Sequence, residues 1–180
     1  MKPDIIHLIE TSLNEHEENP LTLCGYEVVN CSARKGMGIS TYYNKNKFKN
    51  YSTHVTLESQ VTRFTSKNLN VIAVYRSRRG SMEALTSQLK EMLSEEEKAV
   101  LIVGDFNLCY MTNKSNKVSK ELEHCGLKQL MNHPTHIQGG HIDHVYWRDA
   151  SAMWMPPCLE RYSAYYSDHD ASLVTLTGNN

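Results

Sequence analysis

The sequence lacks features that mark several large classes of protein. It has no apolar run of membrane-spanning length, and its first residues, Met1-Lys2-Pro3-Asp4, lack the apolar stretch of a signal peptide. We therefore expect an intracellular protein, nuclear or cytoplasmic, with no membrane partner. The net charge of −1 provides no overall basic excess, so any nucleic-acid surface must depend on local patches.

Cysteine usage excludes two further classes. The five cysteines are an odd number, and none lies in a Cys-x-x-Cys pair. This pattern argues against a disulfide framework and against a cysteine zinc site, so we expect reduced thiols. A mixed zinc cluster is an alternative, although its spacings match no standard zinc finger. Its candidate ligands are Cys125, His133, His136, His141 and His144.

The length and hydropathy are those of one globular domain. The chain has 180 residues, of which 40% are apolar, and we find neither an internal repeat nor a linker. Residues with a period of two, such as Ile39, Thr41 and Tyr43, predict an antiparallel meander in the first third. A strand at 70–75, an amphipathic helix at 81–95 and a strand at 100–103 then predict one parallel crossover in a mixed sheet.

The remaining expected elements are short. Further strands are expected at residues 5–9, 26–33, 38–43, 51–57, 60–65, 142–147 and 171–176. A short helix is expected at 117–124, an apolar turn at 127–130, and extended segments at 154–159 and 162–166.

The stretch from Val100 to Leu108 is the centre of the functional interpretation. Its β-branched residues predict a buried strand that Gly104 ends, with Asp105 and Asn107 at the carboxyl end and Phe106 pointing the opposite way. A carboxylate and an amide at this position can hold a water molecule or a phosphate oxygen. A plain Asp/Asn turn is the simpler alternative for this tripeptide alone.

Other polar residues follow predicted strands and suit phosphoester chemistry. Glu10 and Asp168 offer the oxygen ligands that Mg²⁺ prefers. Asp105 can orient or deprotonate a water molecule, and Asn107 can hold that water or the phosphate. A protonated His169 can donate to a phosphoryl oxygen.

Asp143 can fix the tautomer of His169 and raise its pKa. Two of the candidate residues have a simpler alternative. Glu10 can be a solvated residue at a strand end, and Tyr75 can be a packing residue.

Five stretches carry a family resemblance. In chain order they are Asp4 to Leu13, Val71 to Arg76, Gly104-Asp105-Phe106-Asn107, Ile142-Asp143-His144-Val145 and Ser167-Asp168-His169. In this order and spacing they resemble the endonuclease/exonuclease/phosphatase superfamily, closest to its abasic-site endonucleases and its non-LTR retrotransposon endonuclease domains. The match runs from Asp4 to Leu176, which is nearly the whole chain.

The resemblance implies a fold, a cofactor and roles for single residues. The implied fold is a four-layer α-β-β-α sandwich of two mixed, mostly antiparallel sheets, and the implied activity is Mg²⁺- or Mn²⁺-dependent phosphodiester hydrolysis. It implies that Glu10 binds the metal with Asp168 beside it, and that Asp105 activates water. It also implies that His169, oriented by Asp143, stabilises the transition state.

The resemblance also implies how the substrate is held. Asn107 and Tyr75 are implied to contact the phosphate. We add Arg76 and Arg78 as substrate-binding residues from their charge and position. The expected substrate is a nucleic acid, preferably DNA; the alternatives are RNA, a protein–DNA adduct or a small phosphorylated molecule.

One departure from the family pattern affects the expected activity. The family normally begins with a strand that carries an asparagine, whereas only Met1, Lys2 and Pro3 precede Asp4 here. We therefore expect a single N-terminally shortened domain over residues 1–180, whose missing strand a partner chain or another segment could supply. A catalytically impaired domain kept for binding is the alternative function.

Overall fold

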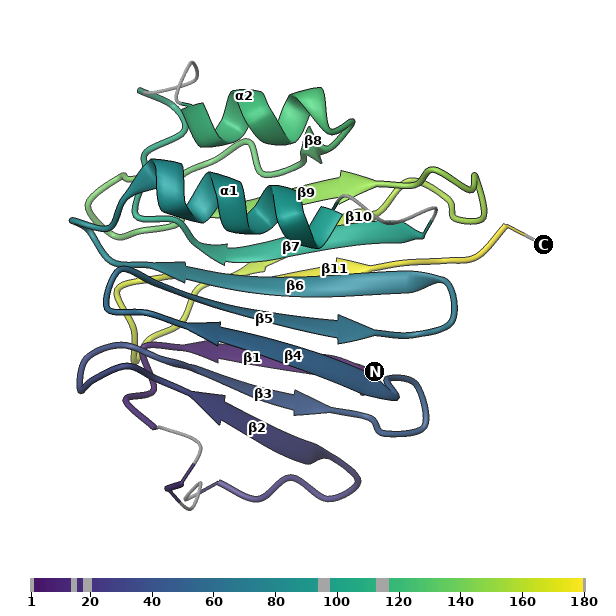
Figure 1. Ribbon diagram of the computed structural model, residues 1–180, viewed down its shortest axis with the longest axis horizontal. Coiled ribbons are helices and arrows are strands. Elements are labelled where there is room, and N and C mark those ends of the chain that lie inside the picture. Colours follow the sequence, from purple (N-terminus) through teal and green to yellow (C-terminus); the bar gives the residue numbers. More distant parts are fainter. Residues whose placement is uncertain (1, 14–15, 18–20, 94–97, 113–116, 180) are drawn as a thin grey trace.

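A computed structural model describes residues 2–13, 16–17, 21–93, 98–112 and 117–179. A mixed sheet of six strands forms the centre of the fold, in the order β4-β5-β6-β7-β9-β8 (Figure 1). Its strands are β4 (Asn50–Val55), β5 (Ser59–Thr65), β6 (Leu69–Arg76), β7 (Ala99–Asp105), β8 (Lys128–Gln129) and β9 (Asp143–Arg148).

The central sheet contains the predicted parallel crossover. Strands β6 and β7 pair in parallel, and helix α1 (Met82–Leu93) connects them, while the other described pairs of this sheet are antiparallel. Helix α1 and helix α2 (Lys117–His124) lie over one face of the sheet. Their apolar residues, including Leu85, Leu89 and Leu122, pack with Ile72 and Ile102 into one fully buried cluster.

Two smaller antiparallel sheets pack on the opposite face. One has the order β1-β3-β2, with β1 (Ile5–Ile9), β2 (Glu27–Cys31) and β3 (Ile39–Tyr43), and the other pairs β10 (Cys158–Tyr162) with β11 (Ala171–Thr175). Ile5 on β1 and Val174 on β11 both pack against one apolar cluster, so the two sheets share it. Among the described residues, β1 and β11 each have a single hydrogen-bonded neighbour strand.

This arrangement is the mixed α/β sandwich that the sequence predicts. Within the described ranges, the helices cover only one of its two outer faces. The helix predicted at 117–124 has these bounds, and the last two residues of the helix predicted at 81–95 lie outside the described residues. All five cysteines are free thiols. None of the described helices is long and apolar enough to span a membrane.

Two local expectations in the second half of the chain were wrong. Of the extended segment predicted at 162–166, only Tyr162 belongs to a strand, where it pairs with Ala171 of β11, while Tyr165 and Tyr166 form a turn. The apolar turn predicted at 127–130 contains the short strand β8, which pairs with β9 at Trp147 and Tyr146. Such short pairings depend on neighbouring strands rather than on the local pattern.

Candidate active site

The candidate site lies where β6, β7 and β9 meet at one edge of the central sheet. Because β6 and β7 are parallel, their carboxyl ends lie together, and Tyr75 is the register partner of Asp105. Strand β9 starts at the same edge, with Asp143 opposite Asp105. The register of three strands therefore brings together side chains that lie 30 or more positions apart in the sequence.

Gly104 allows this close meeting of strands. Its φ is +145°, and a Cβ atom at this position would lie 1.9 Å from the carbonyl oxygen of Val74 on β6. Only glycine can adopt this backbone conformation and tolerate this contact without displacing a strand. The sequence predicted that Gly104 ends the strand. This prediction was wrong, because β7 continues through Asp105.

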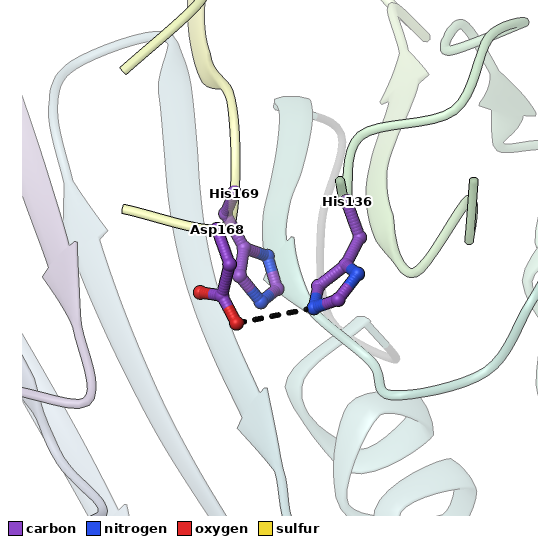
Figure 2. A group of neighbouring side chains, drawn as sticks. All are labelled: His136, Asp168 and His169. Carbon is purple, nitrogen blue, oxygen red and sulfur yellow. Dashed lines mark hydrogen bonds and ion pairs between the residues drawn. The ribbon is translucent and has the colours of Figure 1, made fainter. Parts of the chain in front are cut away.

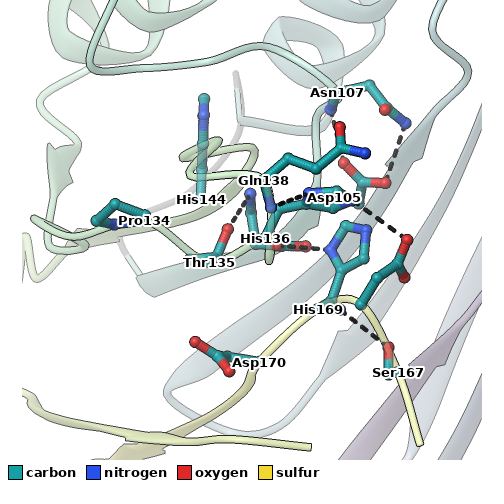
Figure 3. A network of polar contacts seen from close by, with 12 residues as sticks. Asp105, Asn107, Pro134, Thr135, His136, Gln138, His144, Ser167, His169 and Asp170 are labelled. Carbon is teal, nitrogen blue, oxygen red and sulfur yellow. Dashed lines mark hydrogen bonds and ion pairs between the residues drawn. The ribbon is translucent and has the colours of Figure 1, made fainter.

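Asp105 and Asn107 form a rigid pair on the turn after β7. The Asn107 backbone N–H donates to Asp105 Oδ1 at 2.7 Å, and the Asn107 side-chain amide donates to Asp105 Oδ2 at 3.0 Å. Asn107 has a φ of +48°, a conformation that asparagine tolerates better than most residues. Figure 3 shows this pair with the ring of His169 close by.

Arg76 supports this turn from below. Its guanidinium is buried and donates to the carbonyl oxygens of Phe106, Gly80 and Asn107 at 2.7, 2.6 and 3.0 Å. These contacts bury Arg76 against the turn, and the substrate contact predicted for it stays a prediction. Its position at the end of β6 places it under the turn after β7 rather than at the surface. Arg78 is exposed, and its predicted substrate contact stays a prediction.

Burial gives Asp105 an unusual protonation equilibrium. Burial and the neighbouring charge of Asp143 together raise the pKa of Asp105 to about 7, although the Asn107 N–H and the charge of His169 oppose the rise. A carboxyl group with a pKa near neutrality can accept a proton from water and release it again. This property suits the water-activating role predicted for Asp105.

His169 and Asp143 form the second rigid pair. His169 Nδ1 lies 2.8 Å from Asp143 Oδ2. This hydrogen bond raises the pKa of His169 to about 9, although the partial burial of the ring opposes the rise. The imidazolium is therefore the favoured form at neutral pH, and its Nε2–H is left to donate to another group.

Glu10 reaches the same place from the smaller sheet. It directly follows β1 and has a φ of +59°, a strained conformation for a residue with a side chain. The Tyr75 hydroxyl donates to Glu10 Oε1 at 2.9 Å, which joins the two sheets at the site. Burial of the Tyr75 ring and its bond to Glu10 raise the pKa of this tyrosine, so its hydroxyl stays a donor.

Asp168 lies on the bend before β11, next to His136. His136 Nε2 lies 3.2 Å from Asp168 Oδ2, and the His136 ring lies edge-to-face with His169 at 4.9 Å between centroids (Figure 2). No spacing pattern distinguishes His136 from His133 or His141, so the sequence carries no signal for this contact.

The structure thus brings the predicted site residues together. Arg76 supports the group through its bond to the Asn107 carbonyl oxygen, and Arg78 is exposed on the segment that follows β6. The grouped residues are Glu10, Tyr75, Asp105, Asn107, Asp143, Asp168 and His169.

His144 packs instead of acting in the site. It stacks on Phe106 at 4.7 Å and binds the Leu108 carbonyl oxygen through Nε2 at 2.8 Å.

The oxygen atoms of this group suit a hard divalent cation. Two sets of side chains have potential ligand atoms within 4.8 Å of one another: Asp105, Asp143 and His169, and separately His136, Asp168 and His169. Glu10 and Asp168 add exposed carboxylates at the outer side of the site. Carboxylates and an amide oxygen are ligands that Mg²⁺ and Mn²⁺ accept. The zinc alternative built on Cys125 has no support, since none of the described groups combines these ligands.

A β sandwich that carries carboxylates around a His–Asp pair at one sheet edge is an arrangement suited to the hydrolysis of phosphodiester bonds. The chain belongs to the endonuclease/exonuclease/phosphatase family, whose family model matches residues 1–169. Membership in this family supports hydrolysis of phosphodiester bonds. No curated protein matches the chain in sequence.

Several solved structures share the fold. The cytolethal distending toxin of Haemophilus ducreyi has 12% identity and a TM-score of 0.65, with 98% of this chain and 86% of that chain covered. The endonuclease domain of TRAS1, a telomere-specific non-LTR retrotransposon, has 15% identity and a TM-score of 0.61, covering 86% and 79%. A humanized D. rerio TDP2 has 16% identity and a TM-score of 0.60, covering 97% and 86%. At these identities the likeness establishes the fold alone.

Proposed function

We propose that the protein is a metal-dependent DNA endonuclease. The observation that carries this proposal is the pairing, at one sheet edge, of a buried Asp105 with an imidazolium donor, His169, held by Asp143 at 2.8 Å. One group can take a proton from a water molecule, and the other can donate to the phosphoryl oxygen that gains negative charge. DNA is the proposed substrate because the tyrosine on β6 and the likeness to the TRAS1 endonuclease domain favour the nuclease branches.

Each remaining residue has a proposed role in this reaction. Glu10 and Asp168 would hold a divalent cation, Mg²⁺ or Mn²⁺, which when bound would supply positive charge for the developing phosphoryl oxyanion. Asn107 and the Tyr75 hydroxyl, which donate to Asp105 and Glu10 in this structure, contact the phosphate when substrate binds. Asp143 keeps His169 in the tautomer whose Nε2 faces the substrate.

Nicking of supercoiled plasmid tests the proposal. The purified protein is expected to nick plasmid with Mg²⁺ and to stop when EDTA is added. Asp105→Asn and His169→Ala are each expected to reduce the nicking rate at least about 100-fold, the scale for losing a proton-transfer or oxyanion-stabilising group. The matched controls are Glu83→Gln on α1 and His54→Ala on β4, both exposed and outside the site.

Two outcomes would change the conclusion. A folded protein that cleaves RNA, a protein–DNA adduct or bis(p-nitrophenyl) phosphate, but not plasmid, would refute the DNA assignment and keep the hydrolase class. The enzyme proposal would be refuted by a folded protein that hydrolyses none of these substrates. It would also be refuted if the Asp105 and His169 variants had the wild-type rate. A binding domain without catalysis would then be the better description.

We also propose that an extended segment, from a partner chain or another part of a longer chain, pairs with the free edges of β1 and β11. Both strands have one paired neighbour among the described residues, and Val103 on the central strand β7 is only partly buried beneath the small sheets. Backbone amides along these edges are expected to exchange rapidly with deuterium in the isolated protein. Strong protection there would show that both edges are already covered and would contradict the proposal.

A further inference from the structure

His136 contacts two residues of the candidate site at once. Its Nε2 lies 3.2 Å from Asp168 Oδ2, and its ring lies edge-to-face with the His169 ring, at an interplanar angle of 90°. The His136 side chain is 6% exposed, whereas the Asp168 side chain is 65% exposed. A buried imidazole therefore holds a carboxylate that otherwise lies in solvent (Figure 2).

The loop that carries His136 is tied to the segment that carries Asp168 and His169. His136 and His169 form an isolated antiparallel bridge between the two segments. The Ile137 N–H donates to the Asp168 carbonyl oxygen, and the Asp170 N–H donates to the Thr135 carbonyl oxygen, each at 2.8 Å. These backbone bonds fix the position of the His136 ring relative to the site.

The second ring nitrogen decides what Nε2 can do. The backbone N–H of Gln138 donates to His136 Nδ1 at 3.1 Å. A nitrogen that accepts a hydrogen bond carries no proton, so in the neutral ring the proton lies on Nε2. His136 Nε2 is therefore a donor to Asp168 Oδ2.

This tautomer argues against His136 as a metal ligand. A ligating imidazole nitrogen must have a free lone pair, and here the lone pair of the ring is directed at the Gln138 N–H. The closeness of His136, Asp168 and His169 could otherwise be taken for a site with two imidazoles and one carboxylate. The hydrogen-bond pattern identifies a donor next to a ligand instead.

We propose that His136 is a positioning residue that orients the Asp168 carboxylate toward the divalent cation. This inference depends on the proposed function in one respect, namely that Asp168 takes part in binding the metal. Without the His136 donor, the largely exposed carboxylate can rotate away, and each binding event must order it again. The expected consequence is weaker metal binding rather than loss of the fold.

Binding of Mn²⁺ to the purified protein, measured by calorimetry and by the electron paramagnetic resonance of free Mn²⁺, tests this proposal without any assay of activity. His136→Phe keeps a ring against His169 and removes the donor, so Mn²⁺ affinity is expected to fall roughly 10- to 100-fold. His136→Gln places an amide N–H at a similar reach and is expected to restore most of the affinity. His133→Phe, in the same loop, is the matched control and is expected to bind as the wild type does.

Each result supports or overturns the inference. Wild-type affinity in His136→Phe would overturn it, as would a wild-type protein that binds no Mn²⁺. An equal loss in His136→Phe and His136→Gln would identify His136 as a ligand and would also overturn it. A thermal melt of each variant separates loss of metal binding from loss of the fold. Failure of plasmid nicking with normal Mn²⁺ binding would refute the DNA endonuclease proposal and leave the role of His136 unchanged.

Discussion

The two halves of the candidate site differ in how firmly the fold holds them. Asp105 on the central sheet is 3% exposed, and Asn107 bonds to it twice on a turn supported by the buried Arg76. Glu10 and Asp168 come from the small sheets, where both are exposed and follow or precede strands that have one paired neighbour. The comparison teaches that the proton-transfer groups are preorganised by the core, whereas the proposed metal ligands depend on a few contacts between loops.

The largest effect is expected on stability, from a substitution at Gly104 in the half of the site that contains Asp105 and Asn107. Gly104→Ala would place a methyl group 1.9 Å from the Val74 carbonyl oxygen and would force β6 and β7 apart. We expect a loss of about 4 kcal/mol in the free energy of unfolding, the range of exceptional single substitutions. Urea denaturation measures this loss, and Gly139→Ala, which meets no atom within 4 Å, separates the clash from the strain of positive φ. Equal losses in the two variants would contradict the clash.

The next effect is expected at the His169–Asp143 pair. Asp143→Asn removes the carboxylate that holds the imidazolium, so turnover is expected to fall about 100-fold, equivalent to about 2.7 kcal/mol. In the metal-free protein, NMR titration is expected to show the pKa of His169 falling from about 9 toward the ordinary value for histidine. An unchanged His169 titration would mean that Asp143 does not hold the imidazolium.

A smaller effect is expected where the two halves meet. Tyr75→Phe removes the hydroxyl that donates to Glu10 Oε1 at 2.9 Å and leaves the buried ring in place. Losing a hydrogen bond to a charged group is expected to reduce turnover about 10-fold, or about 1.4 kcal/mol. Steady-state kinetics measure this, with Tyr51→Phe on the exposed strand β4 as the control. Equal rates for the wild type and Tyr75→Phe would show that the halves are not coupled through this bond.

The smallest effect is expected in the pH dependence of stability, through His7 on β1. Burial lowers the pKa of His7 to about 3, and its Nε2 has no hydrogen-bond partner among the described residues. The unfolded chain takes up a proton on His7 below about pH 6.5, while the folded protein does not until about pH 3. The stability that neutral His7 contributes is therefore present above pH 6.5 and is lost as the pH falls toward 3.

Replacing His7 tests this sign. When the pH falls from 6.5 to 5.5, the free energy of unfolding of the wild type is expected to decrease by about 1 kcal/mol more than that of His7→Phe. One unit of pKa difference corresponds to 1.36 kcal/mol. Thermal or urea unfolding at the two pH values measures the difference. Parallel pH profiles for the two proteins would show that His7 titrates normally in the fold.

Much of the fold and the site could be predicted from local sequence patterns. The helix at 117–124 and the crossover around the helix at 81–95 follow from apolar residues at helical spacing. The position of Asp105 and Asn107 after a buried strand follows from the Val100–Val103 run. The turn at Tyr165 and Tyr166 was not predicted, because these aromatic residues have the composition of a strand but lie exposed in a turn.

The sequence by itself determined which strands end in chemically active side chains, because strand periodicity, the Gly-Asp-Phe-Asn order and the Asp-His pairs are local properties. Only the tertiary structure decided that Arg76 supports a turn 30 residues away and that His136 bonds to Asp168, 32 residues away. The physical reason is that a charge or an imidazole has no fixed role until the packing of distant segments decides which partners it meets and whether water reaches it.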